Sequence, residues 1–239
     1  APDLVSRRGD QMLVFAGTGT FDTGAVVETN VRAKGADLVL NAGDWDGDGQ
    51  GDLIVRQRKN GAVKVRTGDG RGSFARAVKI GHDMGDVRML EVVGDMTGDG
   101  WPDLMGQPVG GAMRIYPGRG VEPLGPSYQA HSAVSGTRQV GVGRWDGDGA
   151  PDTLVRRGDE LLVYTGNGPG GLTGGRALSL DLSDYDLLTG VPDVTLGNRP
   201  DLVVRERGTG RLLLVESRAN GFKAPRVIAD GAEAYDLVD

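Results

Sequence analysis

Aspartate and glycine alternate in residues 44–52, which read DWDGDGQGD. The side chains of Asp44, Asp46, Asp48 and Asp52 and the backbone carbonyl of Gln50 are spaced so that a tight turn can direct their oxygens at one centre. Calcium accepts six to eight oxygen ligands at about 2.3–2.6 Å, whereas magnesium resists so much dehydration. Without a cation, the clustered carboxylates would repel one another. The pattern therefore predicts a calcium site in this loop.

A second segment, residues 95–103, keeps the pattern as DMTGDGWPD. A threonine hydroxyl stands where the first loop has its second carboxylate, so we expect calcium to bind here more weakly. The expected ligands are the side chains of Asp95, Thr97, Asp99 and Asp103 and the carbonyl of Trp101.

Two further segments depart more strongly from the pattern. In residues 144–152, RWDGDGAPD, the first place holds Arg144, whose guanidinium cannot bind a cation. Calcium at Asp146, Asp148 and Asp152 therefore stays an open question. Residues 193–201, DVTLGNRPD, lack the central acid, and we predict no metal in them. A fifth loop is divided between the chain ends, which leaves only Asp3.

An ordinary turn is the alternative for each loop, because aspartate and glycine are common in turns that bind no metal. Recurrence in register favours the metal for the loops that begin at Asp44 and Asp95. We expect such calcium to be structural, since it would fix a loop between two strands and stabilise the folded state by mass action.

The elements that must position these loops form an internal repeat. Segments beginning with an aspartate recur at intervals of 49, 51, 49 and 49 residues, led by Asp3, Asp52, Asp103, Asp152 and Asp201. Each period holds about four short β-prone runs, and in the second copy the turn at Asn60-Gly61 is typical of a tight hairpin. Four strands in about 50 residues make one propeller blade.

The two chain ends complement each other within this repeat. The chain begins inside a second strand, at residues 3–5, and ends in residues 235–238, which match residues 185–188 of a first strand. We therefore predict an all-β fold: a five-bladed β-propeller of four-stranded blades, closed by pairing of the C-terminal strand with the N-terminal blade. A fragment of a larger ring is the alternative. No linker divides the chain, so residues 1–239 are expected to be one domain.

Composition excludes several classes of protein. The formal net charge of -6, from 33 acids and 27 bases, argues against a nucleic-acid binder, which needs a basic face. The absence of cysteine removes disulfides, thiolate metal sites and thiol nucleophiles. No apolar run is long enough for a membrane span, and the first residues do not resemble a signal peptide. We expect a removed leader or an excised domain.

These units resemble the FG-GAP or VCBS repeat family, whose blades carry D-x-[DN]-G-D-G-x-x-D-L followed by a hairpin and G-x-G. The resemblance covers the whole chain and implies calcium in the loops that begin at Asp44 and Asp95, as in the integrin α-subunit propeller. The arginine near the end of the second strand and the later G-x-G-x-G-x-F form resemble modules attached to secreted bacterial enzymes and toxins. Five such blades are also similar to five-bladed lectins. The resemblance thus implies secretion and a binding function, and it names no ligand.

Other repeated positions offer candidate contacts with a ligand. Arginine lies four residues after the leading aspartate at Arg7, Arg56, Arg156 and Arg205, where it either grips an anionic group or braces neighbouring blades against a loop acid. Tyr116 and Tyr164 are candidate sugar contacts, with packing between blades as the favoured alternative. Trp45 and Trp145 are expected in the core. Trp101 is the aromatic residue we expect to be exposed, and it is the third candidate ligand contact.

Three functions compete at this point. The first is a secreted carbohydrate-binding module that directs a larger protein to a cell-surface glycan or polysaccharide. The second is an interaction scaffold that binds a protein subunit of the same secreted toxin or adhesin assembly. The third, a hydrolase, is disfavoured because His82 and His131 are the sole histidines and no nucleophile elbow or phosphate loop is present. We therefore expect no enzymatic activity, no nucleic-acid partner and no membrane span.

Overall fold

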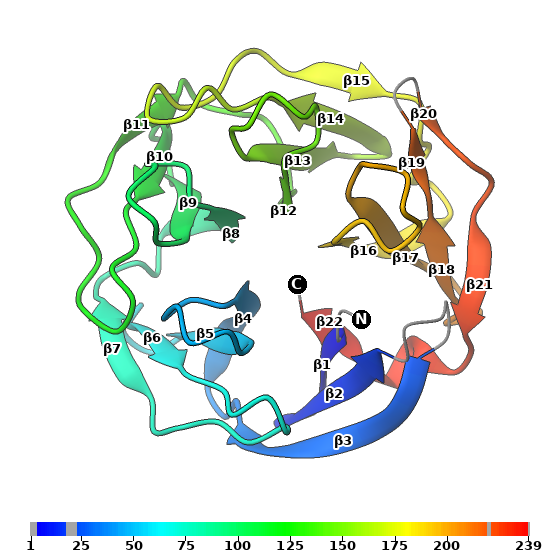
Figure 1. The fold of residues 1–239 in the computed structure, drawn as a ribbon, viewed down its shortest axis with the longest axis horizontal. Helices are drawn as coiled ribbons and strands as arrows, with labels where there is room; N and C mark the ends of the chain where they lie inside the picture. The colour runs from blue at the N-terminus through cyan, green and yellow to red at the C-terminus, as the bar shows by residue number, and fades with distance from the viewer. Residues whose placement is uncertain (1–3, 18–22, 219–220, 239) are drawn as a thin grey trace.

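The protein is described here by a computed structural model that covers residues 4–17, 23–218 and 221–238. Five four-stranded antiparallel sheets stand as blades around a central axis, as Figure 1 shows. Among the described residues, helical structure is confined to one 3-10 turn, Ala232–Ala234. No helix in that part of the chain has the length and apolar character needed to cross a membrane. The predicted all-β, five-bladed propeller is confirmed.

The strands of each blade follow one another from the axis outward. Blade 1 contains β22 (Asp236–Val238), β1 (Leu4–Arg8), β2 (Gln11–Gly17) and β3 (Thr23–Arg32). Blade 2 contains β4 (Ala36–Gly43), β5 (Asp52–Gln57), β6 (Val63–Arg66) and β7 (Val78–Gly81). Blade 3 contains β8 (Val87–Gly94), β9 (Asp103–Pro108), β10 (Met113–Tyr116) and β11 (Tyr128–His131).

The last two blades continue the order. Blade 4 contains β12 (Arg138–Gly143), β13 (Asp152–Arg157), β14 (Glu160–Tyr164) and β15 (Arg176–Leu178). Blade 5 contains β16 (Tyr185–Val191), β17 (Asp201–Glu206), β18 (Leu212–Val215) and β21 (Arg226–Ala229). A small ribbon of β19 (Ser217–Arg218) and β20 (Gly221–Phe222) interrupts blade 5.

Ring closure joins the two ends of the chain. Strand β22 pairs antiparallel with β1, with Val238 opposite Val5 and Asp236 opposite Arg7. An ion pair of 3.0 Å between the Arg7 guanidinium and the Asp236 carboxylate reinforces this pairing. The C-terminal strand therefore completes the N-terminal blade, as the sequence predicts, and covers a sheet edge that would otherwise be open to pairing.

The core lies between neighbouring blades. One cluster combines Leu40 and Val65 of blade 2 with Leu90 and Leu104 of blade 3, all nearly inaccessible to solvent. Because alternate residues of a strand point to opposite faces, each blade contributes one face to each of two such clusters. Trp45 and Trp145 are 0% and 3% exposed, which confirms their predicted place in the core.

The inner strands approach closely around the axis. A β-carbon on Gly141 of β12 would stand 2.0 Å from the carbonyl oxygen of Val92 in β8. A β-carbon on Gly190 of β16 would stand 2.5 Å from the carbonyl oxygen of Gly141. Glycine is therefore required at these two places by the spacing of the blades, because a side chain would push the first strands apart.

Candidate functional site

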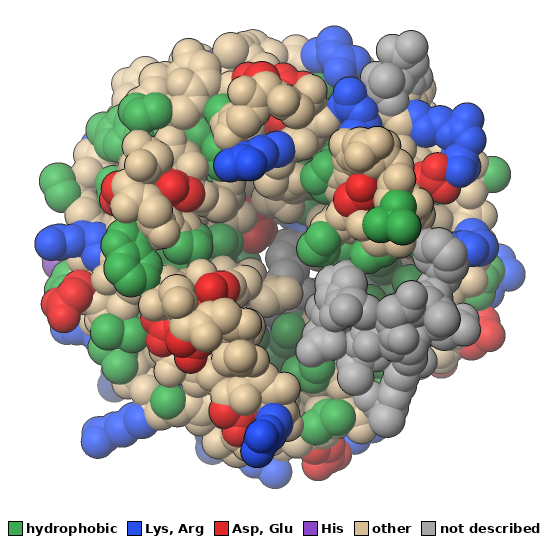
Figure 2. Space-filling view, in the orientation of Figure 1, with side chains coloured by type: hydrophobic (Ala, Val, Ile, Leu, Met, Phe, Trp, Pro, Cys, Tyr) green, Lys and Arg blue, Asp and Glu red, His purple; other side chains and the backbone are tan. Residues whose placement is uncertain are grey.

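The predicted metal loops lie together on one face of the ring. They connect the first strand of a blade to its second strand, at residues 44–52, 95–103, 144–152 and 193–201. Figure 2 shows acidic side chains gathered over these loops around the centre of the face. The remaining aspartate of the divided fifth loop, Asp3, lies outside the described residues.

The last aspartate of each loop holds the loop to the rest of its blade. One carboxylate oxygen of Asp52 accepts the backbone N–H groups of Trp45 and Asp46, at 2.8 and 3.2 Å, and the other accepts the N–H of Gly68 at 2.8 Å. Gly68 follows the third strand of the blade, so the side chain joins two loops. Equivalent contacts, from amides of the same loop and of the loop after the third strand, are made by Asp103, Asp152 and Asp201.

These terminal aspartates are 0% exposed. Desolvation raises the pKa of Asp52, Asp103 and Asp152, and the backbone N–H groups that they accept oppose this rise. Asp52 and Asp103 are predicted metal ligands and Asp152 is a candidate, and the structure shows that each is also the hydrogen-bond acceptor that fixes its loop. A carboxylate oxygen has a second lone pair, so the two roles are compatible.

In loop 44–52 the remaining acids converge. Oxygens of Asp44, Asp46 and Asp48 lie within 4.8 Å of one another. One oxygen of Asp46 accepts the N–H of Asp48 at 3.3 Å, and one oxygen of Asp48 accepts the N–H of Gln50 at 2.8 Å. Several hard oxygens around one point, on partly exposed side chains, fit a calcium ion.

Loop 144–152 gathers its acids in a related way despite Arg144 at its first place. Oxygens of Asp146, Asp148 and the buried Asp152 lie within 4.8 Å of one another. The N–H of Asp148 donates to Asp146 at 3.0 Å, as the N–H of Asp48 donates to Asp46 in blade 2. The acids at the third and fifth places therefore have the same arrangement in the two loops.

In loop 95–103 the first aspartate is used differently. The Asp95 carboxylate accepts the backbone N–H groups of Gly98, Asp99 and Gly100, at 2.7, 3.1 and 2.9 Å. The acids of this loop are not among the groups of converging carboxylates in the described part of the chain. In loop 193–201 the first aspartate has the same role: the Asp193 carboxylate accepts the backbone N–H groups of Gly197 and Asn198.

The residue at the third place separates these two kinds of loop. Where it is Asp46 or Asp146, its carboxylate accepts the N–H of the fifth residue. Where it is Thr97 or Thr195, its hydroxyl points to the terminal aspartate, at 3.5 and 3.2 Å. The N–H of the fifth residue is then accepted by the first aspartate.

Trp101 is 37% exposed and leans from its own loop toward the loop of blade 2. Its six-membered ring lies 3.6 Å from the position that a β-carbon would take on Gly47 and 3.1 Å from the equivalent position on Gly120. Gly47 separates Asp46 from Asp48, so an accessible indole lies beside the converging acids. The expected exposure of Trp101 is confirmed.

The two candidate tyrosines lie in packing positions. Tyr164 is 8% exposed, belongs to a core cluster and contacts the His131 ring edge to face, with ring centroids 5.5 Å apart. Its ring has no face open to a sugar. Tyr164 therefore packs between blades, which is the alternative to a sugar contact. Tyr116 is half-buried against the cluster between blades 2 and 3, and burial raises the pKa of its hydroxyl.

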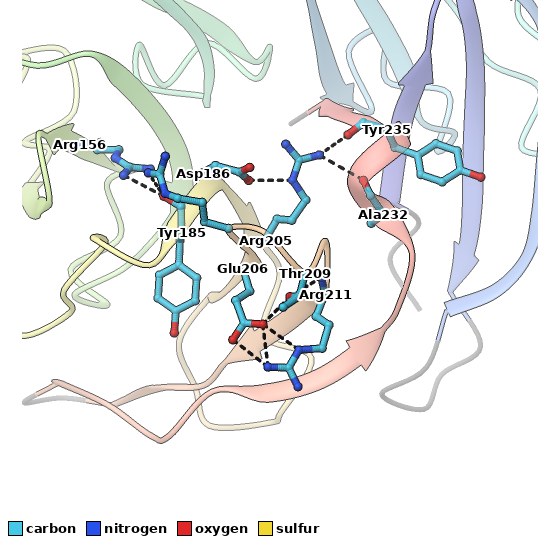
Figure 3. Close-up of polar contacts among 10 residues, drawn as sticks. Arg156, Tyr185, Asp186, Arg205, Glu206, Thr209, Arg211, Ala232 and Tyr235 are labelled. Atoms are coloured by element: carbon cyan, nitrogen blue, oxygen red, sulfur yellow. Dashed lines mark hydrogen bonds and ion pairs between the residues drawn. The ribbon is translucent and has the colours of Figure 1, made fainter.

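The repeated arginines brace one blade against the next. Arg205 of β17 donates to the Asp186 carboxylate of its own blade at 2.7 Å and to the carbonyls of Ala232 and Tyr235, which precede β22 of blade 1 (Figure 3). Arg56 likewise pairs with Asp37 and donates to the carbonyl of Met84, just before blade 3, and to that of Val87, the first residue of β8.

The other members of this set show how the interaction varies. Arg156 donates to the carbonyls of Leu182 and Tyr185, and Gln107 exchanges hydrogen bonds with the backbone of Val134. The predicted bracing is therefore made largely to backbone carbonyls of the next blade. The acids involved lie at the first strands, and the loop acids expected as partners lie at the opposite end of the blades.

One exposed residue that the sequence analysis did not single out is Leu196. It is 86% exposed and adopts a left-handed backbone conformation, φ 58°, which leucine rarely takes. It occupies the place where the other three loops have Gly47, Gly98 and Gly147. Comparison of the repeats at this place is the sequence signal that could have found it.

Comparisons with known proteins agree with this architecture. Residues 44–106 match the FG-GAP-like repeat family. A lectin from Agrocybe aegerita, whose structure describes specific recognition of non-reducing terminal N-acetylglucosamine, has a TM-score of 0.54 at 13% identity; the match covers 96% of this chain and 63% of that chain. No curated protein matches the sequence.

Weaker similarities extend to two bacterial proteins. The BP39L lectin of Burkholderia pseudomallei has a TM-score of 0.49 at 14% identity, with 92% of this chain and 63% of that chain covered. The Photorhabdus luminescens Tc holotoxin pore has a TM-score of 0.48 at 16% identity, with 98% of this chain and 12% of that chain covered. At 13% identity the likeness to the Agrocybe aegerita lectin shows the fold alone, and no conclusion rests on the two matches with lower TM-scores. The chain is a five-bladed β-propeller that carries an FG-GAP-like repeat at residues 44–106.

Proposed function

We propose that this propeller is a secreted carbohydrate-binding module of a larger protein, with the loop face as its binding surface. The observation that carries the proposal is the position of Trp101, 37% exposed and held against Gly47 beside Asp46 and Asp48. An accessible aromatic ring next to a few polar groups is the combination that binds the apolar face and the hydroxyls of a sugar.

Calcium has a structural part in this proposal. Asp44, Asp46 and Asp48 would hold one ion, and Asp146, Asp148 and Asp152 a second, because these side chains already converge. A bound ion would relieve the repulsion among the acids and fix the turn on which Trp101 rests. It would support the sugar site through loop geometry.

The test is binding of the labelled chain to a broad glycan array, with calcium and with a chelator. We expect specific binding that is lost in Trp101→Ala and weakened by the chelator. Val109→Ala is the matched control, since Val109 is an exposed apolar residue in the β9–β10 turn, at the other end of the blade. Terminal N-acetylglucosamine is the first sugar to examine, as the ligand named for the Agrocybe aegerita lectin. If the folded chain binds no glycan on the array, the proposal is refuted.

We also propose that the module has no catalytic activity. His82 lies exposed beside Asp83, and His131 contacts Ser132 and the Tyr164 ring in another blade. Among the described residues, the one serine hydroxyl within hydrogen-bond distance of either histidine is that of the neighbouring Ser132, 3.3 Å from Nδ1 of His131. Hydrolysis of any glycan bound on the array, followed by product analysis, would contradict this.

A second candidate function, a protein-interaction scaffold, is favoured by Leu196. A leucine in a left-handed conformation with its side chain in water is costly, and such strain is often kept for function. Its loop borders a groove of about 500 Å³ lined by Arg144, Arg199 and Val191, which fits a partner with acidic and apolar side chains. Leu196→Gly should keep or raise the melting temperature and lose a partner found by proximity labelling. A partner retained equally by both proteins would argue against this role.

A further inference from the structure

A polar cavity lies on the axis of the ring, away from the loop face. Its volume is about 470 Å³, within the range of small-molecule sites. The lining comes from the first strands of all five blades, which surround the centre in Figure 1, and from arginines of the second strands β1, β5 and β17. The lining residues lie in or near the first half of the first strands and near the end of the second strands, whereas the metal loops join the end of a first strand to the start of a second, so the two sites occupy opposite ends of the blades.

Charges around this cavity are balanced. The lining includes the bases Arg7, Arg56, Arg138 and Arg205 and the acids Asp37, Glu91, Asp186 and Asp236. Three of the bases form ion pairs with three of the acids within single blades, at 3.0, 2.8 and 2.7 Å. A charged ligand would meet like charge whichever way it entered. This mixture of acidic and basic side chains therefore favours a neutral ligand that both donates and accepts hydrogen bonds.

Gln139 is the unusual residue of the lining. It is 2% exposed, and neither its amide oxygen nor its amide nitrogen has a hydrogen-bond partner. Gln139 pairs with Val155, and the equivalent places opposite Val55 and Val204 hold the apolar Val39 and Leu188. A buried amide without a partner destabilises the fold. Glutamine at this place therefore does not stabilise blade 4 in the way that an apolar residue stabilises blades 2 and 5.

We propose that the axial cavity binds a neutral monosaccharide, anchored by the Gln139 side chain. A sugar hydroxyl donates and accepts at once, and the primary amide does the same. One ring can therefore satisfy both atoms of Gln139 once the side chain, whose amide atoms are covered in this structure, turns into the cavity. The remaining hydroxyls face the carboxylates and guanidinium groups of the lining. This site differs in residues and in face from the loop surface of the proposed function, and it does not depend on calcium. Ordered water is the competing occupant.

Gln139→Leu separates these possibilities, because leucine is the residue that blade 5 uses at the equivalent place. We would measure melting temperatures of the intact chain with a panel of neutral hexoses and N-acetylhexosamines at millimolar concentration. At least one sugar should raise the melting temperature of the wild-type chain. Gln139→Leu should raise the ligand-free melting temperature by at least about 2 °C, since it removes an unpaired buried amide.

The same variant should weaken sugar binding, measured by titration calorimetry, by about tenfold or more. Trp101→Ala, on the loop face, should leave this binding unchanged, so failure of the loop-face function and failure of the axial site are distinguishable. The proposal is overturned if no sugar of the panel shifts the wild-type melting temperature, or if Gln139→Leu binds the sugar as well as wild type. A crystal structure grown with the sugar that shows only water at Gln139 would also overturn it.

Discussion

Loop 44–52 and loop 95–103 occupy the same place in neighbouring blades and have the same terminal aspartate contacts, yet their first aspartates behave differently. Asp44 converges with Asp46 and Asp48, whereas Asp95 accepts three backbone N–H groups of its own turn. The backbones are alike, with glycines at φ 77° and 86° in one loop and 76° and 93° in the other. The difference therefore lies in the side chains.

The third residue of the loop accounts for this difference. In loop 44–52 Asp46 accepts the backbone N–H of the fifth residue, so Asp44 is not needed for it. In loop 95–103 the Thr97 hydroxyl points to Asp103 instead, and the N–H of the fifth residue is accepted by Asp95. The three amides that Asp95 accepts occupy most of the lone pairs that an ion would use. The residue at the third place therefore goes with the difference between a loop whose acids converge and a loop whose first aspartate accepts the amides of its own turn.

The largest effect is expected where the two loops agree. Asp52→Ala and Asp103→Ala each remove an acceptor of three backbone N–H groups from a fully buried position. We expect each to lower the free energy of unfolding by about 3 kcal/mol or more in chelator, measured by urea denaturation. Asp99→Ala, on an exposed side chain, is the control. A loss below about 1 kcal/mol would break the claim that these aspartates hold the loops.

Calcium should distinguish the loops next. At an ion concentration about 100 times the dissociation constant, binding at one site adds about 2.7 kcal/mol. We expect Asp48→Asn in blade 2 to reduce the calcium-dependent rise in melting temperature, and Asp99→Asn at the same place in blade 3 to change it little. Equal losses in the two variants would show that loop 95–103 binds calcium as the first loop does.

Exchange of the third residue is a sharper test with a smaller expected effect. Thr97→Asp should allow the carboxylate of residue 97 to accept the amide of Asp99 and release Asp95 for an ion. We expect calcium affinity at blade 3 to rise about tenfold, about 1.4 kcal/mol, in a calorimetric titration. Asp46→Thr should produce the opposite change in blade 2. If neither exchange alters calcium binding, the third residue does not control the loop.

The smallest effect concerns pH, in calcium-free protein. Burial raises the pKa of Asp52, whereas backbone N–H groups of Arg71 and Ser73 lower the pKa of the exposed Asp69. Asp69 therefore contributes stability that is present above its unfolded pKa and lost as pH falls through its folded pKa. Asp52 behaves oppositely: its protonation favours the fold, and that gain is lost as pH rises through its folded pKa.

Carbon-detected NMR titration of the two carboxyl groups would measure these shifts. We expect Asp52 to titrate above, and Asp69 below, the ordinary value for aspartate. If both pKa values shift in the same direction, or if Asp52 titrates below Asp69, the assignment of burial as the dominant effect at Asp52 is contradicted.

Much of the fold was determined by the sequence because its causes are local and repeated. A period near 50 residues, the hairpin at Gly61 with φ 62°, and the match between residues 235–238 and a first strand predict the blades and their closure. The places of Trp45 and Trp145 also followed, since strand alternation directs them inward. Loop spacing likewise identified the acids that could share an ion.

Tertiary structure alone decided which donors and acceptors meet. The sequence analysis assigned Asp95 and Asp44 the same role, because the competition of Thr97 and Asp95 for backbone groups depends on the folded turn. It expected the arginines to reach loop acids, whereas the blade geometry presents backbone carbonyls of the next blade. The place of Gln139 beside an axial cavity requires all five first strands together, and a repeat pattern contains no information on that assembly until the ring is closed.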